Sequence, residues 1–285
     1  MIEKKEVVVS ILMTSFNREL YIAEAIESII NSNFLNFELI IVDDCSNDKT
    51  VAIAKKYAAN DKRIFIYENE KNIGQFANRN KAASYAKGKY LKYVDSDDTI
   101  ASNCIEVMVE AMVTYPQADL GFCYTMNSLI DRYPFLIDSK TAYKEHFFAG
   151  GLLTTGPSGL IFKKTAFEEV RGFEEFGMPS DNHLSLKLAG RNAVVALEPA
   201  LFIWRQHTDQ IFAINRNNYN NILNNYQFNK DIILKYSPLT KAENEKILYN
   251  QKKIFFKNLF KLCFKKGKPF LALHLLLQMN SHPIS

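Results

Sequence analysis

Short apolar runs alternate with helix-like segments over the first hundred residues of this 285-residue chain, a pattern that leaves few folds open. Residues 7–13, 37–42, 64–68 and 89–94 are rich in β-branched and other apolar side chains, as buried strands are. Between these runs, apolar residues recur at helical spacing. Because parallel strands need long crossover connections, the alternation predicts an α/β fold with a mostly parallel, Rossmann-like sheet flanked by helices.

The rest of the sequence continues with helices and strands in a less regular order. The elements expected there are a helix at 102–114, strands at 120–124 and 160–163, a helix at 181–189 closed by Gly190, and a strand at 194–201. Beyond residue 210 the pattern is mostly helical, with Gly267 and Pro269 between two final helices. We therefore expect one large domain at 1–212 and a helical C-terminal extension at 213–285.

Polar clusters follow three of the predicted strands. The first cluster is 14–18, the second is Asp43-Asp44, and the third is 95–98, with the sequence Asp-Ser-Asp-Asp. In sheets of this kind, ligands bind outside the carboxyl ends of the strands. The predicted fold would therefore gather three distant segments of the chain at one crevice.

The Asp-Ser-Asp-Asp segment places three acidic side chains at the end of an apolar strand, where carboxylates repel one another and resist the loss of water. Hard divalent cations such as Mg²⁺ and Mn²⁺ prefer carboxylate oxygens and leave positions open for phosphate oxygens. A metal that bridges a diphosphate is one interpretation of this segment. The other is an aspartate-rich turn that caps the helix expected near Ser102.

Asp43 and the stretch 72–80 offer groups suited to a nucleotide. A carboxylate such as that of Asp43 accepts hydrogen bonds from a base N–H or a ribose hydroxyl. Its alternative role is a contribution to the N-cap of the helix expected after Ser46. The stretch 72–80 combines Gly74, a helix N-terminus and the guanidinium of Arg79, which together suit a base or a phosphate.

Several classes of protein are disfavoured. The sequence contains no glycine-rich dinucleotide fingerprint, no phosphate loop of nucleotide hydrolases and no His-Glu-x-x-His, so dehydrogenase, ATPase and zinc-protease functions lose their main support. The four cysteines lack a zinc-ligand spacing and are typical of reduced thiols in the cytoplasm. The apolar runs at 7–13 and 270–277 match neither a signal peptide nor a bilayer span.

Four segments together resemble the inverting glycosyltransferases of family 2, which have the GT-A fold. They are 9–18, 40–50, 72–80 and 93–98, and with their spacing they cover about residues 7–100. A weaker match continues to about residue 210. The resemblance implies that the chain transfers a sugar from a nucleotide-diphosphate sugar, such as a UDP-sugar, to an acceptor hydroxyl with inversion. The product would belong to a surface polysaccharide or another glycan.

The resemblance also implies roles for individual residues. Residues 7–100 would bind the donor, and residues 101–212 would form the acceptor side. The side chains expected around the nucleotide-sugar are those of Thr14, Phe16, Arg18, Asp43, Arg79, Asp95, Ser96 and Asp97. Asp97 would hold a Mn²⁺ or Mg²⁺ ion, with Asp95 and His207 as further candidate ligands. The metal would neutralise the leaving diphosphate.

The family places a general base at the start of a helix after the sheet, and here Asp181 occupies that place. The family usually shows Glu-Asp, whereas this chain has Ser180-Asp181. A helix N-cap is the alternative role for Asp181. His207 lies in a segment, 204–207, that resembles a family segment near the diphosphate or metal, and a structural hydrogen bond is its alternative role.

The charge of the chain is concentrated in its last 45 residues. The formal net charge is +4, and residues 241–285, with nine Lys and two Glu, contribute +7, which leaves −3 for residues 1–240. A mildly acidic body argues against a nucleic-acid partner. In the tail, basic side chains recur every four residues among aromatic ones, at Lys253, Lys257, Lys261 and Lys265.

This basic amphipathic pattern has three interpretations. The helix could lie in a membrane interface, pack on the large domain, or pack on a second subunit in a homodimer. We expect a cytoplasmic protein, and the first interpretation adds peripheral contact with the inner face of the cell membrane. Two other functions also stay open: a sugar-phosphate nucleotidyltransferase, which uses similar carboxylates, and a non-catalytic scaffold that binds a nucleotide-sugar.

Overall fold

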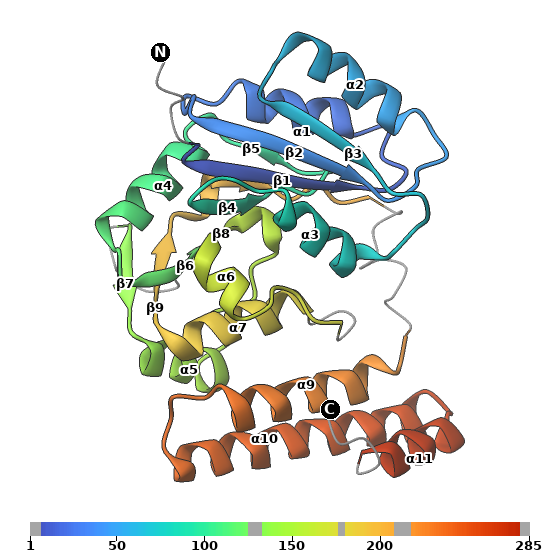
Figure 1. Cartoon of the computed structure of the whole chain (residues 1–285). Coiled ribbons are helices and arrows are strands. Elements are labelled where there is room, and N and C mark those ends of the chain that lie inside the picture. The colour runs from blue at the N-terminus through green and yellow to red at the C-terminus, as the bar shows by residue number, and fades with distance from the viewer. Residues whose placement is uncertain (1–6, 125–132, 176–179, 208–217, 280–285) are drawn as a thin grey trace.

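Eight strands form the central sheet of the chain, in the order β3-β2-β1-β4-β8-β6-β9-β7, and helices cover both of its faces (Figure 1). The computed structural model describes residues 7–124, 133–175, 180–207 and 218–279. Four of the neighbouring strand pairs are parallel, β3 with β2, β2 with β1, β1 with β4, and β6 with β9. The other three pairs are antiparallel. The expected α/β class with a mostly parallel sheet is confirmed.

The first half of the sheet follows the sequence pattern closely. Its elements are β1 (Val9–Ser15), α1 (Ile22–Ile30), β2 (Phe37–Asp43), α2 (Thr50–Asn60), β3 (Ile64–Glu68), α3 (Gln75–Ser84) and β4 (Tyr90–Tyr93). The register pairs Ser15 of β1 with Asp43 of β2, so the polar ends of these two strands lie side by side. All seven residues of β2 are buried, as expected for a strand covered on both faces.

The second half of the sheet is mixed. Its elements are β5 (Thr99–Ile100), α4 (Cys104–Thr114), β6 (Ala118–Cys123), β7 (Phe135–Ile137), α5 (Ser139–Phe148), the 3₁₀ turn η1 (Pro157–Gly159), β8 (Leu160–Lys163), α6 (Lys164–Glu169), α7 (Ser180–Arg191), β9 (Ala193–Leu197), the 3₁₀ turn η2 (Pro199–Leu201) and β10 (Phe202–Ile203). Strand β8 runs antiparallel between β4 and β6. The small sheet of β5 and β10 joins the loop after β4 to the segment that contains His207.

Two expected boundaries are wrong. Gly190 does not close its helix, because α7 continues to Arg191. A Cβ at Gly190 would lie 2.2 Å from the carbonyl oxygen of Tyr236, so this glycine allows close packing. The strand expected at 194–201 ends at Leu197, and Pro199 opens the 3₁₀ turn that follows, since proline lacks the N–H that a ladder needs.

Alternate residues of the strands feed two cores, one on each face of the sheet. Leu12, Ile40 and Leu91 pack with α3, α5, α6 and α7 in the larger core. Ile11 and Ile41, next to them in sequence, pack with α1, α2 and α4 on the other face. This period of two is the one that a strand with two buried faces produces.

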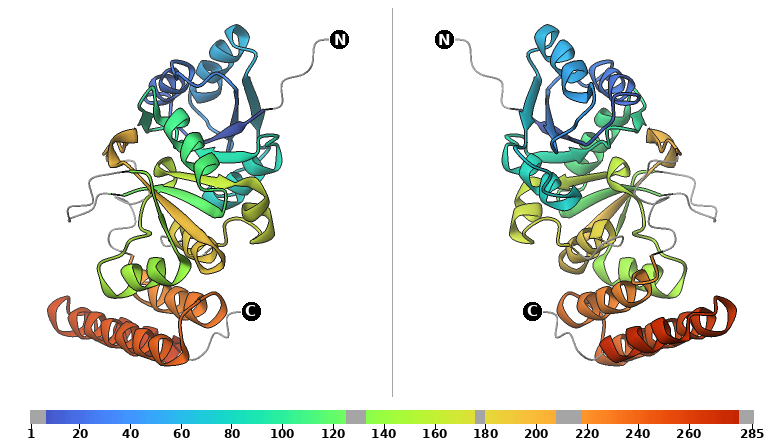
Figure 2. Two further views of the ribbon diagram at one scale, coloured as in Figure 1. Left: turned by 90° about the vertical axis from the view of Figure 1, so that its left-hand side faces the viewer. Right: turned by 90° about the vertical axis from the view of Figure 1, so that its right-hand side faces the viewer.

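The C-terminal extension is a bundle of helices beside the sheet domain, by which we mean residues 7–207 (Figures 1 and 2). It contains α9 (Asn221–Lys235), α10 (Lys241–Phe260), a π turn (Lys261–Lys265) and α11 (Pro269–Gln278). Gly267, with φ of +65°, and Pro269 separate the last two helices, as predicted. None of the described helices is both long enough and apolar enough to cross a bilayer.

The extension divides into two parts by its packing. Phe228 and Ile232 of α9 and Ile247 of α10 belong to the larger core of the sheet domain. Farther along, Phe255 of α10 and Leu275 of α11 belong to a separate small core within the extension. Packing on the sheet domain, one of the three interpretations of the tail, therefore applies to α9 and the first half of α10. The proposed domain boundary at 212/213 falls outside the described residues.

Candidate active site

The ends of β1 and β2 form one wall of a polar crevice. Asp43 is buried at the end of β2, and its Oδ1 accepts hydrogen bonds from the hydroxyls of Ser15 (2.9 Å) and Ser46 (2.6 Å). Its Oδ2 accepts one from the backbone N–H of Ser46 at 2.7 Å. Asp43 therefore stabilises the turn that leads to α2, a role similar to the N-cap contribution given above as its alternative. Its contact with a nucleoside stays a prediction.

Asp97, in the loop after β4, meets the side chains of an arginine and a histidine from elsewhere in the chain. The Nε of Arg18, which follows β1, lies 3.2 Å from Asp97 Oδ2. The Nε2 of His207 lies 3.0 Å from the same oxygen. The His207 ring stacks on Tyr21, with ring centroids 4.4 Å apart. The structure thus brings three predicted site residues together at one carboxylate.

Arg79 of α3 joins two further acidic residues. Its Nη2 lies 2.8 Å from Asp95 Oδ1, and its Nη1 lies 2.5 Å from Asp181 Oδ1. The Arg79 side chain is only 3% exposed. Burial alone would lower the pKa of this guanidinium, but the charges of Asp181 and Asp95 outweigh that effect and raise its pKa. Arg79 is therefore a buried cation that joins the carboxylates of Asp95 and Asp181, and the donor and acceptor roles of these two residues stay predictions.

Asp181 lies in the first turn of α7, where the sequence placed a general base. Burial raises the pKa of its carboxyl, and the Arg79 charge opposes this rise. A base works best when its pKa lies near the working pH, so an upward shift from the ordinary aspartate value suits proton transfer. No side-chain capping bond of Asp181 in α7 is among the described contacts, and its described side-chain partner is Arg79.

Lys92 is a site residue that the sequence did not single out, and Asp98 was indicated only as a member of the acidic segment 95–98. Lys92 is fully buried in β4, and its Nζ donates to the carbonyl oxygen of Tyr93 at 2.8 Å and to that of Ser158 in η1. Ser158 Oγ in turn accepts from the backbone N–H of Asp95 at 3.0 Å. The sequence signal that could have identified Lys92 is the presence of a lysine within an apolar strand. This network fixes the start of the Asp95–Asp98 loop.

Asp98 closes the same loop on the other side. Its backbone N–H donates to the Asp95 carbonyl at 2.9 Å, and its Oδ1 accepts from the backbone N–H of Arg205 at 3.2 Å. Burial, assisted by the charge of Asp95, raises the pKa of Asp98 to about 7. Asp98 therefore links the carboxylate loop to the segment that carries His207.

Residues 10–171, more than half of the chain, match the protein family described as glycosyl transferase family 2. The chain belongs to this family. It is 35% identical over 183 residues to an uncharacterized glycosyltransferase of Methanocaldococcus jannaschii, a match that covers 59% of this chain and 61% of that protein. It is 28% identical over 180 residues to GalNAc(5)-diNAcBac-PP-undecaprenol beta-1,3-glucosyltransferase of Campylobacter jejuni, covering 59% of this chain and 55% of that protein. The chain thus spans about three fifths of the length of these relatives.

Solved structures of glycosyltransferases share the fold. TarS of S. aureus, residues 1–349 in complex with UDP, superposes with a TM-score of 0.67 at 19% identity and covers 92% of this chain and 74% of that one. The mannosyltransferase PcManGT of Pyrobaculum calidifontis, in complex with GDP-Man and Mn²⁺, gives a TM-score of 0.65 at 15% identity. This match covers 97% of this chain and 76% of that one. The expected GT-A fold of a family 2 glycosyltransferase is confirmed.

The remaining predicted residues lie around the same crevice without a contact that defines their role. Thr14 is half-buried near the end of β1, Phe16 is exposed just after it, and Ser96 is buried in the carboxylate loop. Their contacts with a donor stay predictions. Asp44, the neighbour of Asp43, has a structural role, because its carboxylate accepts from the backbone N–H of Gly74 at 3.0 Å and from that of Ile73 at 2.9 Å.

The fit of a metal ion depends on Asp97 and His207. Within the part of the chain that the structure describes, no three histidine, cysteine or acidic side chains cluster closely enough to form a complete metal site. Asp97 and His207 nevertheless direct an oxygen and a nitrogen toward the same place, 3.0 Å apart. Mg²⁺ and Mn²⁺ often take few protein ligands and complete their shell with substrate phosphates and water. The residues present fit an ion that binds together with a diphosphate.

Two surface hollows of the described part of the molecule lie away from these carboxylates. One is lined by Ile53, Lys56, Tyr57 and Asn60 of α2, and the other lies between α9 and α10. We assign the site from the convergence of charged side chains at the ends of four chain segments, because ion pairs between residues 102 positions apart require a specific fold. A shallow concavity on one helix requires no such convergence.

Proposed function

We propose that this chain transfers a sugar from a nucleotide-diphosphate sugar, with UDP as the expected nucleotide, to an acceptor hydroxyl with inversion at the sugar carbon. The observation that carries the proposal is the pairing of Arg79 with both Asp95 and Asp181. The pairing supports the proposal because direct displacement requires a donor-binding group and an acceptor base at one crevice, the roles that we propose for Asp95 and Asp181. Membership of glycosyl transferase family 2 and the fold shared with UDP-bound TarS support the proposal.

The donor would bind at the ends of β1, β2 and β4. The nucleoside would lie among predicted residues from the ends of β1 and β2 and from α3, namely Thr14, Phe16, Arg18, Asp43 and Arg79. Asp95 and Ser96 would contact the ribose side, with Asp97 next to the diphosphate. Arg18, already paired with Asp97, is placed to turn its guanidinium toward phosphate oxygens.

Asp97 and His207 would hold a Mn²⁺ or Mg²⁺ ion, with Asp95 as a further candidate ligand. When bound, the ion would supply positive charge that stabilises the negative charge developing on the leaving diphosphate. The structure of PcManGT with GDP-Man and Mn²⁺ supports a divalent cation in a protein of this fold. The choice between the two metals is a matter for measurement.

Asp181 would act on the acceptor. Its carboxylate takes the proton of the attacking hydroxyl, the hydroxyl oxygen forms a bond to the anomeric carbon, and the bond from that carbon to the diphosphate oxygen breaks with its electron pair. Attack from the face opposite the diphosphate inverts the anomeric carbon. Arg79 favours the charged form of Asp181 against the effect of burial, and its hydrogen bond would fix the position of the carboxylate beside the donor.

The acceptor would be a saccharide, free or lipid-linked, in the synthesis of a surface polysaccharide or another glycan. The name of the Campylobacter jejuni relative states a lipid-linked acceptor for that protein, which supports this class. No observation favours a nucleotidyltransferase. Because Asp95, Asp97 and Asp181 are all present at the site, none favours a non-catalytic scaffold either.

The test is a screen of nucleotide-sugars with and without Mn²⁺, first by thermal shift and then by product analysis. A preferred nucleoside diphosphate should raise the unfolding temperature more when Mn²⁺ is present, because ligands stabilise the folded state that binds them. Turnover should release a nucleoside diphosphate. Release of pyrophosphate from a triphosphate would instead indicate a nucleotidyltransferase, and tight nucleotide binding without any turnover would indicate a scaffold.

A further inference from the structure

The end of the C-terminal extension exposes large apolar side chains that no other described part of the chain covers. We call residues 260–277, which run from the end of α10 through the π turn into α11, the tip. Phe270 is 88% exposed, Phe264 71% and Phe260 60%. The rings of Phe260 and Phe264 contact each other, with centroids 4.5 Å apart. Aromatic side chains gathered in this way on a surface are typical of a binding face.

These side chains occupy the outward faces of two amphipathic helices. On α11, exposed Phe270, Leu273 and Leu277 recur at three- and four-residue intervals. The opposite face of α11 contributes Ala272 and Leu275 to the small core of the extension. The helix therefore already has a packed side, and its exposed apolar side remains for an external partner.

The charged residues in and next to the tip are lysines. Residues 246–279 contain eight lysines and no aspartate or glutamate. Four of these lysines lie in the tip itself, at Lys261, Lys265, Lys266 and Lys268. Lysines beside exposed aromatic side chains are the composition of helices that lie in a membrane interface, with the rings among acyl chains and the ammonium groups at lipid phosphates.

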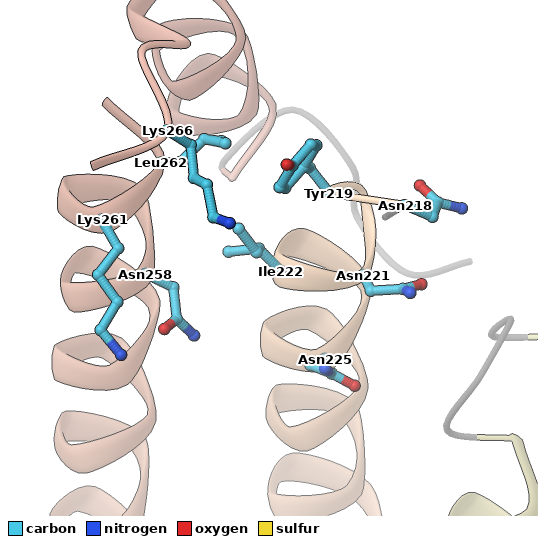
Figure 3. A pocket seen from close by; sticks show the side chains of 9 residues that line it. All are labelled: Asn218, Tyr219, Asn221, Ile222, Asn225, Asn258, Lys261, Leu262 and Lys266. Carbon is cyan, nitrogen blue, oxygen red and sulfur yellow. The ribbon is translucent and has the colours of Figure 1, made fainter. Parts of the chain in front are cut away.

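A hollow of about 330 Å³ between α9 and α10 adds polar groups next to the tip (Figure 3). Its lining includes Lys261, Lys266 and Asn258 from the α10 side and Asn225 from α9. Ammonium and amide N–H groups both donate hydrogen bonds to phosphate oxygens. The hollow therefore presents donors suited to a phospholipid headgroup, next to the exposed rings.

We propose that the tip is a peripheral binding surface for membranes that contain anionic phospholipid. A second copy of the chain fits less well, because a two-fold interface built from this surface would bring lysines of the two copies together without acidic partners. The proposal does not depend on sugar transfer.

The test measures binding of the full chain to vesicles of phosphatidylcholine alone and of phosphatidylcholine with phosphatidylglycerol, by flotation. The wild type should float with the anionic vesicles at low salt, and high salt should weaken binding. Replacing Lys265 and Lys266 by Gln should reduce the partition coefficient about 25-fold, since each lysine near an anionic surface contributes about a fivefold change. The matched control replaces Lys56 and Lys62, exposed lysines of the sheet domain, by Gln and should change it less than about twofold.

A second pair of variants tests the apolar contribution. Phe270→Ser should lower the partition coefficient about tenfold. Leu35→Ser, at a residue 72% exposed on the sheet domain, should leave it unchanged. Both residues are exposed, so unfolding temperatures should match the wild type and exclude misfolding. Failure of the wild type to float at low salt would overturn the proposal. A dimer that Phe270→Ser dissociates, without vesicle binding, would also overturn it and assign the tip to a second copy.

Discussion

Replacing Arg79 by Met removes the cation that joins Asp95 to Asp181 while keeping an apolar side chain of similar length beside Phe76 and Phe173. Removing one partner of a buried ion pair costs about 3–5 kcal/mol when the other charge is left buried. The side chains of Asp95 and Asp181 are 28% and 21% exposed, so water compensates in part and the low end, about 3 kcal/mol, applies.

One feature of Arg79 reduces that cost. Its buried Nε has no hydrogen-bond partner among the described residues, and leaving such a donor unpaired costs about 1 kcal/mol in the wild type. We therefore expect Arg79→Met to lower the free energy of unfolding by about 2 kcal/mol. Urea denaturation measures this change as a lower midpoint at an unchanged slope.

The same variant should shift the pH dependence of transfer. Arg79 opposes the burial effect on Asp181, so without it the pKa of Asp181 rises further. A base must be deprotonated to accept a proton, and the acid limb of the kcat profile should therefore move to higher pH. A purely structural role for Arg79 would reduce stability without moving that limb.

Arg63 provides a matched control. It pairs with Asp61 at 2.6 Å and lies over the ring of Phe37, but the Arg63 side chain is 29% exposed and its partner is only two positions away in the sequence. Arg63→Met should cost less than about 1 kcal/mol and leave the pH profile unchanged. If Arg79→Met cost no more than Arg63→Met, or left the acid limb in place, the argument for a shared central cation would be refuted.

Four further variants test separate parts of the structure. Asp181→Asn should reduce kcat about 10²–10⁴-fold with little change in donor binding. Asp97→Asn should instead weaken Mn²⁺-dependent donor binding, which calorimetry measures. Equal donor affinity in the two variants would contradict the assigned roles. Burial lowers the pKa of His146 to about 4 from 6.5, so its neutral form is favoured in the folded state. The unfolded chain then binds the extra proton between these values, and stability falls by up to about 3 kcal/mol as pH drops from 6.5 to 4. His146→Asn should remove that slope in urea titrations, and an unchanged slope would assign it to other groups. Gly190→Ala should cost about 1–3 kcal/mol because its Cβ meets a backbone carbonyl, and a neutral result would show that the end of α9 can move away.

The sequence predicted the parts of the fold that have a strong local signal. The strands that end at Ser15, Asp43 and Tyr93 are apolar runs bounded by polar turns, and parallel topology then places their ends together. The pattern could not reveal β7, because three residues are too few to show alternation. The pattern also could not predict the end of α7, because Gly190 allows a close approach to Tyr236, a residue distant in sequence.

In the candidate site, too, the sequence identified individual residues but not the contacts between them. Strand ends and the family resemblance identified Arg79 and Asp181 separately, but their pairing depends on the tertiary path of the chain across 102 positions. Lys92 and Asp98 were not selected as site residues because their roles depend on carbonyl and N–H groups supplied by η1 and by the segment near Arg205. A sequence shows which side chains are available, and only the fold shows their backbone partners.

The shared core between α9 and the sheet domain limits how the chain can be shortened. Cutting it at residue 212 would remove Phe228, Ile232 and Ile247 and leave the apolar side of α7 open to water. It would also take away Asp231, whose carboxylate lies 3.3 Å from the buried ring of His183 on α7. A fragment intended for crystallisation or assay should therefore keep α9, α10 and α11 together, because Leu223 of α9 shares the small core of the extension with Phe255 of α10 and Leu275 of α11.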